Sequence, residues 1–133
     1  MSLRDLILNI DESKMKSYRD LIVWQKSMNL VTQVYQAIRS FPKEEMFGLA
    51  NQIRRCSVSI PSNMAEGYGR QASGDYIRHL QISRGSLFEL QTQLEICLNI
   101  QYLSKGEYDN LCELCNEIER MLNSLIKKLK EKA

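Results

Sequence analysis

The chain has 133 residues, 44% of them hydrophobic and 26% charged, so it can form one domain with a buried core. The formal net charge of +2 is too small to indicate a nucleic-acid partner by itself, so any such argument depends on where the arginines lie. The sequence lacks the run of roughly 18 to 20 apolar residues that a membrane span needs, and its first residues lack the apolar core of a secretory signal. We therefore expect a cytoplasmic protein without membrane segments, whose four cysteines are reduced thiols.

The composition favours helices, because there are only six glycines and two prolines and few β-branched runs. Residues 1–16 are expected to form an N-terminal arm that is ordered only if it docks on something. Residues 17–133 are expected to form the folded domain.

The first helix should begin near Ser17, whose spacing to Asp20 fits a capping box, and should end before Pro42. Apolar residues at 4-3-4-3 spacing predict its core stripe, which consists of Trp24, Met28, Val31, Tyr35 and Ile38. Leu21 on one flank, and Leu30 and Val34 on the other, widen this stripe.

The second helix should begin at Pro42 or Lys43 and end at Gly67 and Gly69. Its predicted buried face consists of Met46, Ala50, Ile53, Ser57, Ile60 and Met64. Pro61 falls inside this helix and predicts a kink, because it removes one backbone hydrogen bond.

The third helix should run from Ser73 to about Tyr102 and has apolar residues on two faces. Its main stripe consists of Ile77, Leu80, Arg84, Leu87, Gln91, Leu94 and Leu98. Ile82, Ile96 and Ile100 lie nearly opposite this stripe, and a helix with two apolar faces usually packs against two partners. We therefore predict that these three isoleucines form an interface with another subunit.

The fourth helix should follow a capping box at residues 104–107 and bury an unbroken stripe of Leu111, Cys115, Ile118, Leu122, Leu125 and Leu129. The connections between helices are only a few residues long, which makes consecutive helices antiparallel neighbours. The predicted fold is an all-α, up-down-up-down four-helix bundle.

The second and third helices carry a group of arginines, namely Arg54, Arg55, Arg70, Arg78 and Arg84. Guanidinium groups bind phosphates well, and two tyrosines lie among these arginines, so a nucleic-acid surface is one interpretation. The alternative is that the arginines close contacts between subunits, because arginine is also enriched at protein interfaces.

Asn63 and Glu66 should face the third helix among small residues, where we expect a structural polar network with Glu66 paired to Arg78 or Arg84. Catalysis is not expected, because the chain has one histidine and no set of nucleophile, base and orienting group. Cys112 and Cys115 form a lone pair without the further ligands that zinc requires. We therefore predict no enzyme activity, no metal and no cofactor.

Several motifs in order resemble the bacterial four helix bundle protein family, also known as the intervening-sequence protein of 23S ribosomal RNA. They are residues 18–26 (YRDLIVWQK), 41–45 (FPKEE), 52–55 (QIRR), 59–70 (SIPSNMAEGYGR) and 84–90 (RGSLFEL). The resemblance covers about residues 17 to 130. It implies a helical bundle that assembles as a ring-like homopentamer and a link to RNA, with Arg54, Arg55, Arg70, Arg78 and Arg84 as nucleic-acid candidates. A similar bundle is the accessory protein of a reverse transcriptase, so a protein-interaction scaffold or accessory subunit remains the alternative.

Overall fold

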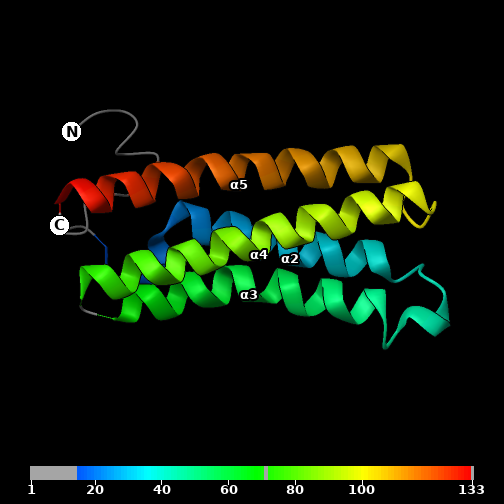
Figure 1. Ribbon diagram of the computed structural model, residues 1–133, viewed down its shortest axis with the longest axis horizontal. Helices are drawn as coiled ribbons and strands as arrows, with labels where there is room; N and C mark the ends of the chain where they lie inside the picture. Colours follow the sequence, from blue (N-terminus) through cyan, green and yellow to red (C-terminus); the bar gives the residue numbers. More distant parts are fainter. Residues whose placement is uncertain (1–14, 71, 133) are drawn as a thin grey trace.

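The structure is a computed structural model that describes residues 15–70 and 72–132. Four long helices lie side by side in it: α2 (Ile22–Ile38), α3 (Leu49–Gly69), α4 (Ser73–Asn99) and α5 (Lys105–Lys132) (Figure 1). Two short 3-10 helices, η2 (Tyr18–Asp20) and η3 (Lys43–Glu45), precede α2 and α3. Within residues 15–70 and 72–132 there is no strand. The predicted arm falls outside the described residues except for Met15 and Lys16.

Each helix packs against two neighbours, since α3 contacts α2 and α4, and α5 contacts α4 and α2. The connection from α3 to α4 lies at one end of the bundle and the connection from α4 to α5 at the other (Figure 1). Apolar side chains from all four helices form one buried core, with Leu30, Ile53, Leu87 and Leu122 among its fully buried members. The fold is a four-helix bundle.

Most buried residues of α2 lie one position before the residues of the predicted stripe. Its buried residues are Val23, Ser27, Leu30, Val34 and Ile38, so the centre of the predicted stripe is wrong except for Ile38, while the predicted flank of Leu30 and Val34 is correct. Met28 is 42% exposed and Tyr35 is 40% exposed. Both sets have helical spacing, and the buried set includes the polar Ser27. Ser27 is accommodated because its hydroxyl donates to the Val23 carbonyl at 2.7 Å.

Two predicted helix starts are wrong, while the capping chemistry at the first is confirmed. Ser17 caps η2 with a complete capping box, but the extended conformation of Leu21 ends that turn, and α2 begins at Ile22. The α3 helix begins at Leu49, where the Glu45 carboxylate accepts the Leu49 N–H at 3.0 Å. Met46 therefore precedes the helix and is exposed, in contrast to its predicted burial.

The other predicted residues of α3 are buried, and α3 continues through the buried Pro61 to Gly69. The α4 helix ends at Asn99, three residues before the predicted end, because Gln101 has a φ of 65° that no right-handed helix can contain. On α4, Leu80, Leu87 and Leu94 are buried, whereas the other four members of the predicted stripe are half-buried. All six predicted core residues of α5 are buried, and its capping box joins Ser104 to Glu107.

A candidate nucleic-acid interface on α3, α4 and the end of α5

The helices that carry the five arginines, α3 and α4, are held together by small residues. The Ser83 hydroxyl donates to the Ile60 carbonyl at 2.8 Å. The hydroxyl oxygens of Ser59 and Ser86 are 2.9 Å apart. Nearer the turn, a side chain on Gly67 would meet the Cβ of His79 at 2.6 Å. These contacts fix the register between α3 and α4 and thereby the positions of the polar groups along their seam.

Asn63 belongs to a network that spans this seam. Its side-chain nitrogen donates to the Ser59 carbonyl at 2.9 Å and to the Ser59 hydroxyl at 3.0 Å. The Ser59 hydroxyl in turn lies against Ser86 of α4. Hydrogen bonds therefore link Asn63 to α4 through Ser59.

The predicted partner of Glu66 is wrong, because Glu66 pairs with neither Arg78 nor Arg84. Its carboxylate accepts from Arg70, one turn later on the same helix, at 3.1 Å, and lies 3.5 Å from His79 Nε2 of α4. The hydrogen bond from Arg70 and the charge on His79 lower the pKa of Glu66. The buried His79 is oriented by its Nδ1, which is 2.9 Å from the Asp75 carbonyl.

The five arginines do not form one continuous patch. Arg54 donates to the Met46 carbonyl at 2.8 Å near the start of α3, and Arg84 donates to Asn123 of α5 at 2.9 Å. Arg70 and Arg78 lie on either side of the α3–α4 turn. Arg55 and Arg78 are exposed, and neither makes a hydrogen bond or ion pair within the part of the chain that the structure describes.

Charge is divided unequally between the two ends of the bundle. The end at which α3 turns into α4 also contains the start of α2 and the end of α5 (Figure 1). When each helix is divided at its midpoint, residues 15–30, 60–70, 72–86 and 119–132 belong to this half, which we name the basic end. The basic end contains eleven lysines and arginines but five aspartates and glutamates. The opposite half, residues 31–59 and 87–118, contains five lysines and arginines but eight aspartates and glutamates.

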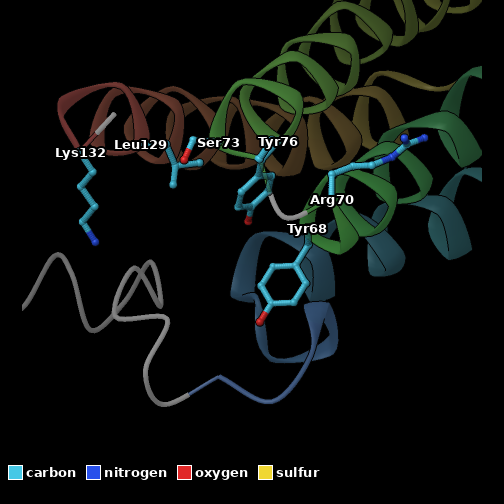
Figure 2. A pocket seen from close by; sticks show the side chains of 7 residues that line it. Tyr68, Arg70, Ser73, Tyr76, Leu129 and Lys132 are labelled. Atoms are coloured by element: carbon cyan, nitrogen blue, oxygen red, sulfur yellow. The ribbon is translucent and has the colours of Figure 1, made fainter.

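Sequence reasoning missed the contribution of α5 to the basic end. Four lysines, Lys127, Lys128, Lys130 and Lys132, lie in its last two turns, where they suit the helix dipole. Only the folding of the bundle brings them beside Arg70 and Arg78. At this end Lys132, Leu129, Tyr68, Arg70, Ser73 and Tyr76 line a cavity of about 370 Å³ (Figure 2).

The bundle also has two exposed apolar surfaces. The three predicted interface residues on α4, Ile82, Ile96 and Ile100, are 42%, 44% and 47% exposed. A second surface is a groove of about 320 Å³ between α2 and α3, whose lining includes Trp24, Met28, Val31, Val58, Pro61 and Ala65. Trp24, Met28 and Val31 of this groove belong to the stripe that the sequence predicts to be core.

Three of the four cysteine thiols are buried. Burial raises the pKa of Cys56 and of Cys115 to about 12 and that of Cys97 to about 11, so these thiols are poor nucleophiles near neutral pH. Residues 15–70 and 72–132 contain no cluster of three or more His, Cys, Asp or Glu side chains that could hold a metal ion. None of the described helices is both long and apolar enough to cross a membrane.

Comparison with known proteins now identifies the family. The sequence profile of the 23S rRNA-intervening sequence protein matches residues 19–124. The chain belongs to this family. A crystal structure of a protein of unknown function from the S23 ribosomal protein family of Bacteroides thetaiotaomicron has the same fold, with a TM-score of 0.74 and 25% sequence identity. The similarity covers 80% of this chain and 96% of the other chain. No protein with a curated function matches the sequence.

Proposed function

We propose that this protein is a non-enzymatic, oligomeric up-down-up-down bundle that binds RNA or another nucleic acid through the basic end of α3, α4 and α5. The observation that carries the proposal is the separation of charge along the bundle, with eleven basic and five acidic residues at the end that holds Arg70 and Arg78. A protein with a small net charge can bind a polyanion if its positive charge is gathered on one surface. The family link to 23S rRNA inserts supports RNA as the first ligand to test.

The five arginines contribute unequally under this proposal. Arg70 and Arg78 lie at the basic end, whereas Arg54 and Arg55 lie in the half with an excess of acidic residues. Arg84 lies at the basic end but its side chain reaches across to α5. We therefore expect Arg70 and Arg78 to make the larger contribution to nucleic-acid affinity.

A salt-titrated binding assay with a fluorescent RNA tests this function. We expect binding near ~50 mM salt that weakens steeply as salt is added, because phosphate contacts release counterions. The double variant Arg70→Ala/Arg78→Ala should bind more weakly than Arg54→Ala/Arg55→Ala, which is its charge-matched control. Failure of the unaltered protein to bind any RNA or DNA at ~50 mM salt would reject the proposal.

The oligomeric part of the proposal depends on Ile82, Ile96 and Ile100. Three large apolar side chains exposed on one face of a helix are typical of a surface that another subunit covers. Gly85 lies between them on the same face, in open space, where a second helix can approach closely. We propose a homo-oligomer that uses this face, with a ring-like pentamer as the form that the family resemblance suggests.

A second candidate function is a protein-interaction scaffold or accessory subunit, and the groove between α2 and α3 favours it. The groove is lined mainly by apolar side chains, including the half-buried Trp24 and the exposed Met28 and Val58. Under this alternative the arginines serve subunit contacts, so the double variant Arg70→Ala/Arg78→Ala would change the particle mass, and RNA would not bind.

A further inference from the structure

The cavity at the basic end is formed by three helices that meet only in the folded bundle. Tyr68 comes from the end of α3, Ser73 and Tyr76 from the first turn of α4, and Leu129 and Lys132 from the last turn of α5 (Figure 2). Its volume of about 370 Å³ is within the range of sites that hold small ligands or parts of larger ones. The cavity can therefore admit one flat group of the size of a nucleobase.

The walls of this cavity suit an aromatic ring. Tyr68 and Tyr76 form an edge-to-face pair with ring centroids 5.9 Å apart and an angle of 89° between the rings. Tyr76 is buried and holds the half-buried Tyr68 in place, so little conformational entropy is lost when a ligand stacks on Tyr68. Leu129 adds an apolar surface from α5.

Two basic side chains come from the residues that line the cavity. Lys132 and Arg70 lie on opposite sides of it, and the Arg70 guanidinium turns away from the cavity (Figure 2). That guanidinium donates to the Glu66 carboxylate at 3.1 Å. A single strand that places one base inside the cavity has a phosphate on each side of that base. The arrangement thus offers an aromatic wall for the base, with Lys132 at the rim as a cation for a flanking phosphate.

We propose that this cavity binds one unpaired base of a single-stranded RNA, with Tyr68 as the stacking surface and Lys132 as a phosphate contact. The inference rests on the proposed function and names the form of nucleic acid that the basic end recognises. A base inside a duplex is covered on both faces by its neighbours, so a duplex reaches only the rim. A single strand reaches the rim and the aromatic wall together.

Fluorescence anisotropy with a labelled 12-nucleotide single-stranded RNA, and with the matching duplex, tests the inference on the full chain. We expect the single strand to bind more tightly than the duplex. Tyr68→Leu keeps an apolar side chain but removes the aromatic face, and should weaken single-strand binding about tenfold or more with an unchanged salt slope. Lys132→Gln should weaken binding and also reduce the slope of log K against log salt by about 0.7.

Two control variants match these changes elsewhere on the bundle. Tyr35→Leu removes an exposed tyrosine from α2, and Lys105→Gln removes an exposed lysine at the opposite end of α5. Both should bind the single strand within about twofold of the unaltered protein. If Tyr68→Leu binds as well as Tyr35→Leu, the cavity is not the base site, although nucleic-acid binding at the basic end stands. If the unaltered protein binds neither RNA, the proposed function fails and this inference with it.

Crosslinking avoids any dependence on the folding of a variant. A single-stranded RNA that contains 5-bromouridine is irradiated with the unaltered protein, and the modified peptides are located by mass spectrometry. A crosslink at Tyr68 or Tyr76 supports the inference. Crosslinks confined to residues outside the cavity overturn it.

Discussion

Gly67 of α3 lies so close to His79 of α4 that a methyl group added to Gly67 would be 2.6 Å from the His79 Cβ. A Cβ atom is fixed by its own backbone, so the clash can be relieved only if the two helices separate. Gly67 has no positive φ, and its role is to permit this close approach rather than to form a turn. The sequence predicts a helix stop at Gly67 and Gly69, and α3 ends at Gly69.

The first prediction concerns this contact. Gly67→Ala should destabilise the protein by about 1 to 3 kcal/mol, as overpacked core substitutions do. A loss of stability would point to the close contact, because alanine within a helix is otherwise favoured over glycine by about 1 kcal/mol. Urea denaturation followed by circular dichroism measures the change.

Gly69→Ala is the matched control for Gly67, since a Cβ at Gly69 meets nothing within 4 Å. It should leave stability unchanged or raise it by up to about 1 kcal/mol. Equal stability of the Gly67 and Gly69 variants would show that the α3–α4 seam is looser than the structure indicates.

The second prediction tests which face of α2 is buried. Leu30 is fully buried and Met28 is 42% exposed. Leu30→Ala should lower the free energy of unfolding by about 2 to 5 kcal/mol, whereas Met28→Ala should cost less than about 1 kcal/mol. Denaturant titrations of the two variants compare them directly. A larger cost at Met28 would restore the stripe that the sequence alone predicted.

The third prediction concerns the Glu66 carboxylate, whose pKa is lowered first by the hydrogen bond from Arg70 and then by the charge on His79. Its folded-state pKa is below the ordinary value of 4.5, so its ion pair stabilises the fold above that pH. This contribution is lost as the pH falls through the lowered folded-state pKa. In an NMR titration, Arg70→Ala should move the pKa of Glu66 upward, toward 4.5.

Arg78→Ala is the control for this titration, because Arg78 does not pair with Glu66. It should change the pKa of Glu66 much less than Arg70→Ala does. An upward shift in the Arg78 variant of the same size would mean that the pairing predicted from the sequence is present in solution.

The fourth prediction tests the isoleucine face of α4. Ile96→Glu/Ile100→Glu should reduce the particle to the 15.5 kDa monomer while the helical circular dichroism is kept, because charges cannot be buried unpaired at an interface. Light scattering coupled to size exclusion measures the mass. Thr32→Glu/Gln36→Glu adds the same charge to an exposed face of α2 and should leave the mass unchanged. An oligomer that survives the double isoleucine change does not use this face.

The sequence predicted less of the candidate site than of the fold. The burial of Ile53, Ile60 and Ile118 follows from their spacing alone. By contrast, the partner of Glu66 depends on how α3 and α4 face each other. A shift of one residue between the two helices would change which side chain lies opposite Glu66. The contribution of Lys132 to the basic end required the end of α5 to lie beside the α3–α4 turn, and the sequence separates these segments by about 60 residues.

The apolar repeat determined that four helices form and that they bury one core, because a helical stripe of leucine and isoleucine has no other way to leave water. The motifs also determined the family. The tertiary structure decided which of two adjacent stripes on α2 turned inward, since Ser27 could be buried once its hydroxyl had a carbonyl to bond. It also gathered charges from three distant parts of the chain, residues 15–30, 60–86 and 119–132, at one end. That surface arises from packing, and no local pattern along the chain encodes it.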